Sequence, residues 1–586
     1  PKRWTEEKDI WAAGYFMWPW DKMHTRVVHI DTEKSIVNLS PDIRWWAGYG
    51  LYSMPVVKDT PYYFYNVLAE ISIPGEFYID RDAGKLYFYP PGKIEGNEII
   101  VSTLDSPIVK LERASHMVFH GLTFECTWRN AVTLDECADV LLSGNVIRNT
   151  GNLGVTINDG WRNGIAGCDI YDTGEGGIRV SGGDMKKLLP GGHYVENNHI
   201  YRFNRFSHGG GKTGITISGV GNRVSHNLMH DSSYNAIFFS GNNHVVEYNE
   251  IYDVMNEGRD GGAIYTHCGS KYLTNRGNVM RYNFIHNITE HSSPLKTHQV
   301  TGLYVDSLNG AMTMKGNVFY RCTERAMFTH GPDTRIEDNI FVDCRAGITQ
   351  SNRTYLLREE RPVRLWKENT LDTIRHRQPP WAERYPQVSG IFERKPYGEP
   401  VNIFIERNIH SGTPPVSISG DFLYDLNRVA NNIEGQDIYF LDRENLNFGL
   451  APGSPVYAVS SFEPLPFGEI GLYPDPLRAS WPAKRSPAGK YYRADWKAPV
   501  SDVMSKFPRI ERVSREKEYE VSKRVNPIRI DGVLSKEEWF GLDKDKAIAM
   551  DEEHLTGVKR ETPGSYAWIT HDEENIYIGI EHVSDP

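Results

Sequence analysis

Two aspartates, Asp260 and Asp306, stand where their carboxyl groups could carry acid–base chemistry. Each lies beside an insertion in a repeated pattern and flanks a short apolar segment, GGAIYT for Asp260 and TGLYV for Asp306. Two carboxyl groups on either side of a bond can share the work of catalysis, because one donates a proton while the other removes a proton or attacks. An aspartate beside glycine also caps turns for structural reasons alone. Whether the pair has a catalytic or a structural role therefore depends on the elements that position it.

Aromatic and imidazole side chains accompany the two aspartates. If Ile264 is aligned with Leu303, side chains of neighbouring segments fall into two columns on one face. The columns are Phe238, Tyr265, Tyr304 and Phe328, and, two residues on, Ser240, His267, Asp306 and His330. Aromatic rings stack on the apolar faces of sugar rings, and imidazoles and carboxylates bind hydroxyl groups. We predict that the following residues bind a carbohydrate: His267, Tyr265, Tyr304, His330, Glu257 and Arg259.

The same alignment limits how the two aspartates could act together. It puts Asp260 and Asp306 at opposite ends of their strands, so seven extended residues would separate them by roughly 23 Å. A pair that cleaves a glycosidic bond needs carboxyl groups about 5 to 9.5 Å apart. Counting back from the next repeat instead moves Asp306 two residues toward Asp260. The sequence leaves both registers open.

Their neighbours suggest a division of roles. The positive charge of Arg259 beside Asp260 should favour the ionised form of that carboxyl group, which suits a base or nucleophile. Asp306 lies among Tyr304, Val305 and Leu308 and is the better candidate for the acid.

The elements that must position these residues belong to a repeat. An asparagine, or a residue in its place, is followed by a short apolar segment at intervals of 24, 29, 29, 22, 34, 34 and 22 residues. The positions are Asn145, Asp169, Asn198, Asn227, Asn249, Asn283, Asn317 and Asn339, with Thr123 at the first place and a resumption at Asn408 and Asn432. A fixed period indicates one structural unit stacked many times, each unit burying its apolar strand against its neighbours.

The segments after each asparagine are too short for helices and rich in β-branched and aromatic residues. A second short strand comes about ten residues later, as in GVTI, GITI and AIFF. We therefore predict an all-β fold, a right-handed parallel β-helix with stacked asparagines at one inner corner, where amides bond to one another. A solenoid builds its binding face where insertions interrupt the period.

The flanking segments predict further parts. Residues 10–98 are aromatic-rich, end in a hairpin around Asp82, and indicate an inserted or accessory β-domain. Residues 99–350 and 401–465 form the β-helix, 351–400 a helical loop insertion, 466–516 a tail or linker, and 517–586 part of a β-sandwich. Four tryptophans of the first domain, Trp18, Trp20, Trp45 and Trp46, could line the cleft or fill that domain's own core.

Composition excludes some partners. The formal net charge of −11 argues against nucleic acid, whose phosphates need a basic face. No run of eighteen apolar residues is long enough for a membrane span. The chain opens with PKRWTEEKDI, which is not a signal peptide, and we expect such a peptide to have preceded it in a secreted or periplasmic protein. No motif assigns a metal, so no cofactor is predicted; calcium is possible but cannot be assigned. The oligomeric state stays open.

Several segments together resemble glycoside hydrolase family 141, a family of β-helix enzymes with α-L-fucosidase and xylan-directed activity. They are PGEFYIDRDAGKLYFYPP, SGGD, GVGNRVSHNLMHD, EYNEIYDV, DGGAIY, RYNFIH, GLYVDSLNGAMTMKGNVF and PPWAERYP. The resemblance implies that Asp260 and Asp306 are the catalytic aspartates. Gly261 and Ser307 replace the second aspartate of the family's DDGAIY and YLDD patterns. The C-terminal segment, from NPIRIDGVLSKEEW to the end of the chain, resembles the start of a family 9 carbohydrate-binding module.

The resemblance implies a glycoside hydrolase acting on a plant or algal polysaccharide, with α-L-fucosidase activity as the first expectation. A xylan-directed hydrolase, either xylanase or β-xylosidase, is an alternative. A polysaccharide lyase is another, since Lys271, Arg276, His267 and Tyr265 include the bases and cations that such a reaction uses. A non-catalytic carbohydrate-binding solenoid is a fourth, and Gly261 and Ser307 favour it.

Overall fold

The computed structural model describes residues 2–484 and short strands between residues 522 and 582. Within 2–484 the description leaves out 17, 41–44, 47–50, 53–59, 210, 268–270, 289–299, 358, 394–396, 420–423, 436–437 and 460. The second predicted insertion, TEHSSPLKTHQV, therefore falls almost wholly outside the described residues. The chain divides into two compact units, residues 1–501 and 502–586.

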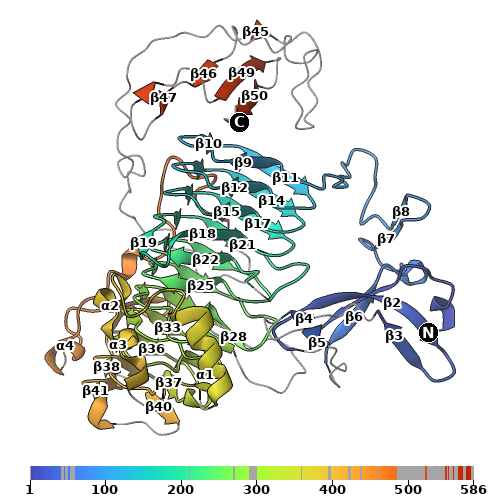
Figure 1. Cartoon of the computed structure of the whole chain (residues 1–586). Coiled ribbons are helices and arrows are strands. Elements are labelled where there is room, and N and C mark those ends of the chain that lie inside the picture. The colour runs from blue at the N-terminus through green and yellow to red at the C-terminus, as the bar shows by residue number, and fades with distance from the viewer. Residues whose placement is uncertain are drawn as a thin grey trace. The chain divides into compact units, whose positions relative to one another are not determined.

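Three long parallel sheets run along the first unit and confirm the right-handed parallel β-helix (Figure 1). One full turn of the chain, here called a coil, adds one strand to each sheet. The first sheet, called the face sheet, contains β9 (Val109–Glu112), β12 (Val132–Asp135), β15 (Val155–Asn158), β18 (Ile178–Asp184), β22 (Ile215–Val220), β25 (Ile237–Asn242), β28 (Gly261–Thr266), β31 (Val300–Val305), β34 (Arg325–Thr329), β37 (Ile348–Ser351) and β40 (Val416–Ser419). A two-residue strand, β19 (Leu189–Pro190), pairs with β18.

The other two sheets have eleven strands each. The second contains β10 (Val118–His120), β13 (Leu141–Ser143), β16 (Gly164–Ala166), β20 (Tyr194–Glu196), β23 (Arg223–Ser225), β26 (Val245–Glu247), β29 (Val279–Arg281), β32 (Thr313–Lys315), β35 (Arg335–Glu337), β38 (Phe404–Glu406) and β41 (Arg428–Ala430). The third contains β11 (Thr123–Thr127), β14 (Val146–Thr150), β17 (Asp169–Thr173), β21 (His199–Tyr201), β24 (Leu228–His230), β27 (Glu250–Tyr252), β30 (Phe284–His286), β33 (Val318–Tyr320), β36 (Ile340–Val342), β39 (Ile409–Ser411) and β42 (Ile433–Glu434).

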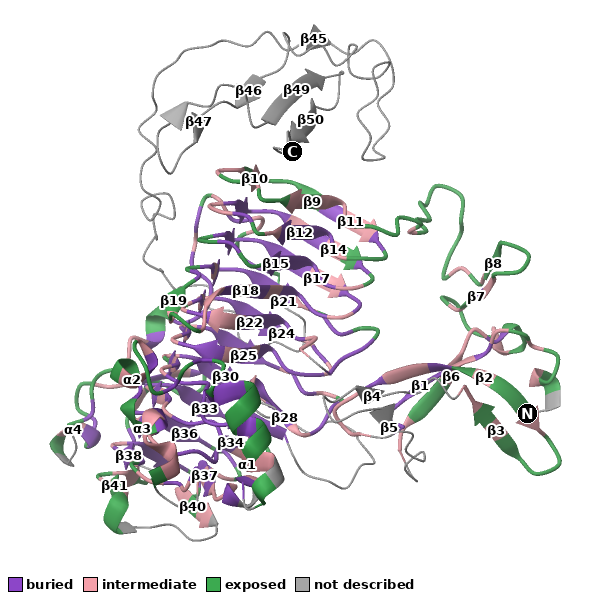
Figure 2. Cartoon of the chain, viewed as in Figure 1, coloured by how far each residue is buried: buried purple, intermediate pink, exposed green. Residues whose placement is uncertain are grey.

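Apolar side chains from all three sheets fill the interior of the coils. In Figure 2 most residues of the middle strands are coloured as buried, whereas β9 and β10 are more exposed. Ile237, Ile264 and Leu303 occupy successive strands of the face sheet in register and are fully buried. Each buried strand therefore stabilises only its neighbours, as expected of a solenoid.

The predicted asparagine ladder stands at the corner between the second and third sheets. The side-chain amide of Asn249 donates to Oδ1 of Asn283 at 2.9 Å, and Asn283 donates in the same way to Asn317. The residue before each of these ladder positions has a left-handed backbone, with Tyr248 at φ 56° and Tyr282 at φ 55°. The amides satisfy one another, so burying them costs little.

Two ladder predictions were wrong by one residue. Cys168, not Asp169, occupies the ladder place, because its N–H donates to Oδ1 of Asn198 at 2.8 Å. Asp169 is instead the first residue of β17, in register with Val146 of β14, and it forms an ion pair with Arg478 at 2.8 Å. The first ladder place is likewise Leu122 rather than Thr123. A cysteine is small enough for the corner, and it carries no amide that would mark the position in the sequence.

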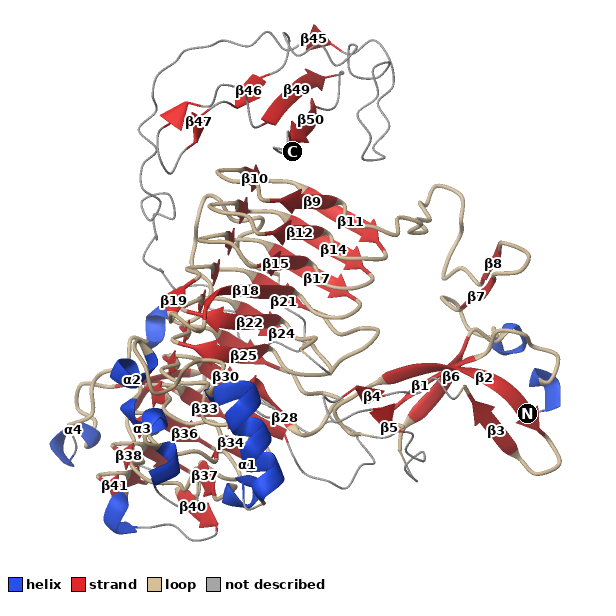
Figure 3. Ribbon diagram, in the orientation of Figure 1, coloured by secondary structure: helices blue, strands red, loops and turns tan. Residues whose placement is uncertain are grey.

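A helical insertion leaves the β-helix after β37 (Figure 3). It contains 3-10 turns at Thr354–Leu357 and Ile391–Glu393, α1 (Glu360–Trp366), a π-helical turn at Lys367–Leu371, α2 (Trp381–Arg384) and α3 (Pro386–Ser389). Its apolar residues, including Trp366 and Trp381, pack on Tyr272, Leu273 and Leu308 of the β-helix. The indole of Trp366 donates to the Tyr272 carbonyl at 2.9 Å. The insertion therefore covers the turns that come after β28 and β31.

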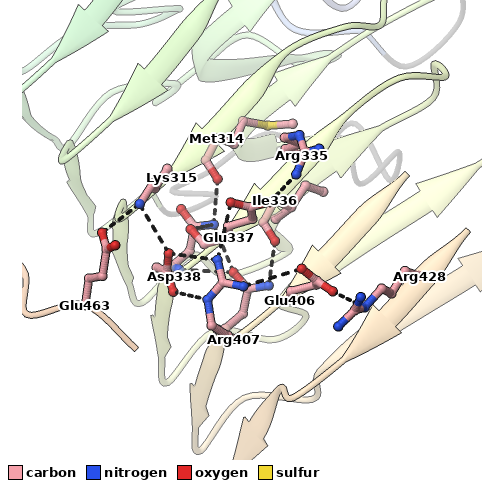
Figure 4. A network of polar contacts seen from close by, with 12 residues as sticks. Met314, Lys315, Arg335, Ile336, Glu337, Asp338, Glu406, Arg407, Arg428 and Glu463 are labelled. Atoms are coloured by element: carbon pink, nitrogen blue, oxygen red, sulfur yellow. Dashed lines mark hydrogen bonds and ion pairs between the residues drawn. The ribbon is translucent and has the colours of Figure 1, made fainter. Parts of the chain in front are cut away.

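The chain then returns to register. Asn339 donates to Asn408 at 2.9 Å across an interval of 69 residues. Figure 4 shows Arg407 beside this joint, where its guanidinium donates to both oxygens of Asp338 at 2.8 and 3.2 Å. Lys315 bridges Asp338 and Glu463 at 3.7 and 2.7 Å.

The first hundred residues form a separate small sheet in the order β3-β2-β1-β6. Its antiparallel strands are β1 (Trp11–Gly14), β2 (Met23–Asp31), β3 (Ile36–Leu39) and β6 (Tyr62–Tyr65), beside the pair β4 (Trp45–Trp46) and β5 (Leu51–Tyr52) and the hairpin β7 (Phe77–Asp80) and β8 (Lys85–Phe88). The predicted hairpin around Asp82 is confirmed. Trp18 packs with the core of this sheet and Trp20 against the β-helix core, whereas the side chains of Trp45 and Trp46 lie outside the described residues.

The tail after β42 adds β43 (Phe440–Asp442), β44 (Asn447–Leu450), α4 (Val456–Val459) and a turn at Phe467–Glu469, and a turn at Tyr424–Leu426 precedes β41. A further turn at Lys2–Trp4 opens the chain, and another lies at Leu68–Glu70. The second unit contains β45 (Ser522–Lys523), β46 (Ile548–Met550), β47 (Glu552–Glu553), β48 (Val558–Lys559), β49 (Ser565–His571) and β50 (Ile576–His582). The expected carbohydrate-binding module falls mostly outside the described residues.

Candidate active site

The face sheet carries the predicted aromatic column. Phe238 lies in register with Tyr265, Tyr265 with Tyr304, and Tyr304 with Phe328. Their ring centroids are 5.8, 5.3 and 5.0 Å apart. The register that aligns Ile264 with Leu303 is therefore the observed one, and Asp260 precedes β28 while Asp306 comes after β31.

Asp306 is held by donors on both carboxylate oxygens. The hydroxyl of Tyr265 donates to Oδ2 at 3.1 Å, and the N–H of Ser307 donates to Oδ1 at 2.5 Å. Its own N–H donates to the Thr266 carbonyl at 2.9 Å, which continues the strand pairing. The side chain is 14% exposed. Asp306 is thus fixed in orientation and still reaches the surface.

Asp260 is partly buried and sits in a bend with φ 52°, in the left-handed region. The hydroxyl of buried Tyr234 donates to the Asp260 carbonyl oxygen at 3.3 Å. The next position has no room for a side chain, since a Cβ on Gly261 would lie 2.5 Å from Oδ1 of Asn235. The bend therefore depends on the hydrogen bond from Tyr234 and on glycine at position 261.

The two aspartates converge on one phenol. Burial raises the pKa of Tyr304, and the negative charges of Asp306 and Asp260 add to that rise. Burial raises the pKa of Tyr234 and Tyr265 well above the ordinary value, and both aspartates add to that rise. The carboxyl groups consequently face a common group of tyrosines.

The separation of roughly 23 Å expected for an extended path does not describe the side chains. Asp260 lies in a bend rather than on an extended strand, and it is close enough to Asp306 for their charges to interact. The Asp260-Gly261-Gly262 sequence is a turn signal, but it does not indicate where the carboxyl group points.

The pKa of Asp260 is raised to about 6, first by burial and second by repulsion from Asp306. Arg353 and Arg325 lower it, but not enough to offset the burial. The expectation that Arg259 holds Asp260 ionised was therefore wrong. The elevated pKa lets Asp260 keep its proton at a higher pH than an ordinary aspartate does.

His330 lies directly against Asp306. Its Nε2 is 3.8 Å from Oδ1 of Asp306, and its Nδ1 is 2.6 Å from the hydroxyl of Ser351. The ring is fully buried, and burial lowers its pKa to about 3. His330 is accordingly a neutral imidazole at the edge of the carboxyl pair.

His267 comes directly after β28 and is exposed. Its ring lies 6.5 Å from that of Tyr265 with an angle of 24° between the planes. It therefore extends the polar column outward from the tyrosines.

Glu257 and Arg259 lie on the other side of Asp260, against the N-terminal sheet. Oε2 of Glu257 accepts a hydrogen bond from the hydroxyl of Tyr15 and pairs with Lys22, both at 3.1 Å. Arg259 is fully buried. Burial raises the pKa of Tyr15, and the nearby charge of Arg259 opposes that rise. These contacts connect both side chains to the N-terminal sheet.

Three further residues of the site, Arg353, Arg325 and Tyr234, were not identified from the sequence. Arg325 precedes the aromatic column position Phe328 and lies over that ring at 4.3 Å. Arg353 lies two residues beyond β37, and its charge reaches Asp260, Tyr304 and His330.

The cations proposed for a lyase are placed differently. Arg276 is 1% exposed and forms an ion pair with Asp333, so its contact at the corner of the coil is structural. Lys271 is exposed. Among the residues that the structure describes, no three histidine, cysteine, aspartate or glutamate side chains gather as metal ligands, and no helix is long and apolar enough to cross a membrane.

Known proteins were compared with this chain by sequence and by structure. No curated protein matches the sequence. A solved structure named "Glycoside hydrolase" aligns at 12% identity with a TM-score of 0.42, covering 76% of this chain and 71% of its own. Residues 107–188 match the family described as "Right handed beta helix region", in agreement with the right-handed parallel β-helix of the first unit.

Proposed function

We propose that this protein is a secreted or periplasmic glycoside hydrolase acting on a plant or algal polysaccharide, with α-L-fucoside as the first substrate to test. The observation that carries the proposal is the convergence of Asp260 and Asp306 on Tyr304, with the pKa of Asp260 raised to about 6. Glycosidic bond cleavage uses two carboxyl groups, one of which holds a proton that it can donate to the leaving oxygen.

In this proposal Asp260 is the general acid. Below pH 6 its carboxyl group is largely protonated and can donate its proton to the leaving glycosidic oxygen. Burial and, second, the negative charge of Asp306 keep that proton in place until the bond breaks.

Asp306 would act as the nucleophile or as the base for water. The hydroxyl of Tyr265 and the N–H of Ser307 orient its two oxygens. The partly exposed rings of Phe238 and Tyr265 offer their faces to the apolar side of a sugar, and exposed His267 offers nitrogen atoms to its hydroxyl groups.

The test is substitution of each aspartate by asparagine, Asp260→Asn and Asp306→Asn, in the full chain. The substrates are p-nitrophenyl α-L-fucopyranoside, p-nitrophenyl β-D-xylopyranoside and a panel of plant and algal polysaccharides. We expect turnover to fall by about 10³-fold or more, the scale of losing a central catalytic group, while circular dichroism and melting temperature stay those of a folded protein. Asp135→Asn is the matched control, since Asp135 holds the equivalent position two residues after the column in an early coil and bonds to Asn158.

The products separate the alternatives. Release of xylose or xylo-oligosaccharides rather than fucose would move the proposal to a xylan-directed hydrolase. Unsaturated uronates that absorb in the ultraviolet would indicate a lyase. Binding isotherms without any product would indicate a carbohydrate-binding solenoid. Wild-type turnover in both asparagine variants would overturn the assignment of the aspartates.

A further inference from the structure

The segment just before Asp260 is held by the N-terminal sheet. Glu257 accepts a hydrogen bond from the hydroxyl of Tyr15 and forms an ion pair with Lys22, both at 3.1 Å. The N–H of Arg259 donates to the Pro19 carbonyl at 2.8 Å. The bonds from Glu257 span 242 and 235 positions of the chain, yet they meet close to the acid proposed above. We call Tyr15, Pro19 and Lys22 the N-terminal clamp.

Two side chains of the clamp are buried, so its contacts are more than a surface pairing. Tyr15 is 5% exposed and the side chain of Lys22 is 9% exposed, whereas that of Glu257 is 48% exposed. Burial raises the pKa of Tyr15, and Glu257 adds to the rise. A buried ammonium group is costly without an anion, so Lys22 depends on Glu257.

A stack of rings extends from the clamp to the backbone of Asp260. The ring of His208 lies 5.4 Å from Tyr15 on one side and 4.8 Å from Tyr234 on the other. Tyr234 in turn donates its hydroxyl to the Asp260 carbonyl. Gly258 fits against this stack without a side chain, since a Cβ there would lie 2.3 Å from the Tyr234 ring.

The bend at Asp260 is therefore fixed from two sides. The clamp fixes residues 257 and 259, and the ring stack fixes the carbonyl of residue 260. A left-handed backbone at a residue other than glycine is unfavourable and persists where its surroundings impose it. Without the clamp, the chain around Asp260 would gain other conformations.

We propose that the N-terminal sheet is a working part of the active site: Tyr15, Pro19 and Lys22 hold residues 257–260 in the bend that directs Asp260 toward Tyr304 and Asp306. The three are positioning residues, since they act on Asp260 through Glu257 and Arg259. The catalytic consequence of the clamp rests on the function proposed above, whereas its structural consequence does not.

Hydrogen exchange of the intact protein, measured by mass spectrometry, tests the structural part without any substrate. The variant is Tyr15→Phe combined with Lys22→Met, and the control is Arg3→Met, which breaks the ion pair of Arg3 with Glu70 near the same sheet. We expect amides of residues 256–261 to exchange at least about tenfold faster in the double variant, as a bond-held segment opens more often. The control should match the wild type. Unchanged exchange in the double variant would overturn the proposal.

Kinetics on whichever probe glycoside the wild type cleaves tests the catalytic part. We expect the double variant to lose about tenfold or more in kcat with a nearly unchanged KM, because substrate binding by the aromatic column persists while the acid is misplaced. Lys22→Arg, which keeps the charge, should retain most of the rate. A double variant with wild-type kcat would overturn the positioning role.

The two proposals fail separately. If Asp260→Asn keeps full turnover while the double variant still exchanges faster, the clamp stands and the catalytic assignment falls. If Asp260→Asn abolishes turnover while the double variant behaves as wild type in both measurements, the clamp falls and the assignment stands.

Discussion

Asp306 raises the pKa of Asp260 although the two residues belong to opposite ends of neighbouring strands. The bend at Asp260 leaves the two carboxyl groups near enough for their charges to interact. Their protonation is therefore linked, and a change at one aspartate should be measurable at the other.

The first prediction concerns that linkage. Asp306→Asn removes a negative charge, so the pKa of Asp260 should fall from about 6. Carbon-13 NMR titration of aspartate carboxyl groups measures this in an inactive variant. An unchanged titration of Asp260 would contradict the repulsion between the two carboxyl groups.

The second prediction concerns Arg353, whose charge lowers the pKa of Asp260. Arg353→Met should move the alkaline limb of kcat/KM to higher pH, because the acid then keeps its proton longer. Arg345→Met, at an exposed arginine of a neighbouring turn, is the control and should leave the limb in place. A shift in both variants, or in neither, would remove Arg353 from this role.

The third prediction concerns stability. Unfolded aspartate has a pKa of about 3.9, whereas folded Asp260 has one of about 6. The folded state thus binds the proton more tightly, and stability is lost as pH rises from about 4 to 6. Asp260→Asn removes that loss and should stabilise the protein at pH 7 by up to about 3 kcal/mol, from about two pKa units at 1.36 kcal/mol each. Urea unfolding at pH 4 and pH 7 should show a difference that grows with pH, and a constant difference would count against it.

The fourth prediction concerns the asparagine ladder. Asn283→Ala leaves the N–H of Asn249 and the carbonyl of Val246 buried without their side-chain partner, and should cost about 2–4 kcal/mol. Asn432→Ala, at the last ladder place and partly exposed, should cost less. Equal losses at the two positions would mean that burial does not set the value of a ladder bond.

The repeat predicted the fold well because each coil obeys the same local rule. Stacked asparagines and short apolar segments fix the strand positions, but the register of Asp306 against Asp260 stayed open until the pairing of β28 with β31 was seen. The asparagine pattern misses the ladder position of Cys168, because a cysteine fits the space there but carries no amide.

The site was predicted less completely, because its decisive features are not periodic. The bend at Asp260 is imposed by Tyr15, Pro19 and Tyr234, which come from other parts of the sequence. Arg353 acts from the first residues after the regular coils, where the repeat no longer guides alignment. The expected effect of Arg259 on Asp260 was wrong for a related reason: adjacency in sequence says nothing about where a guanidinium points.

The joint at which Asn339 bonds to Asn408, and Arg407 to Asp338, closes the scaffold beneath the helical insertion as if no residues intervened. The β-helix is thus continuous across the insertion, which packs on the turns after β28 and β31. The pairing of the coils therefore does not depend on the length of the insertion, although the insertion buries Tyr272, Leu273 and Leu308.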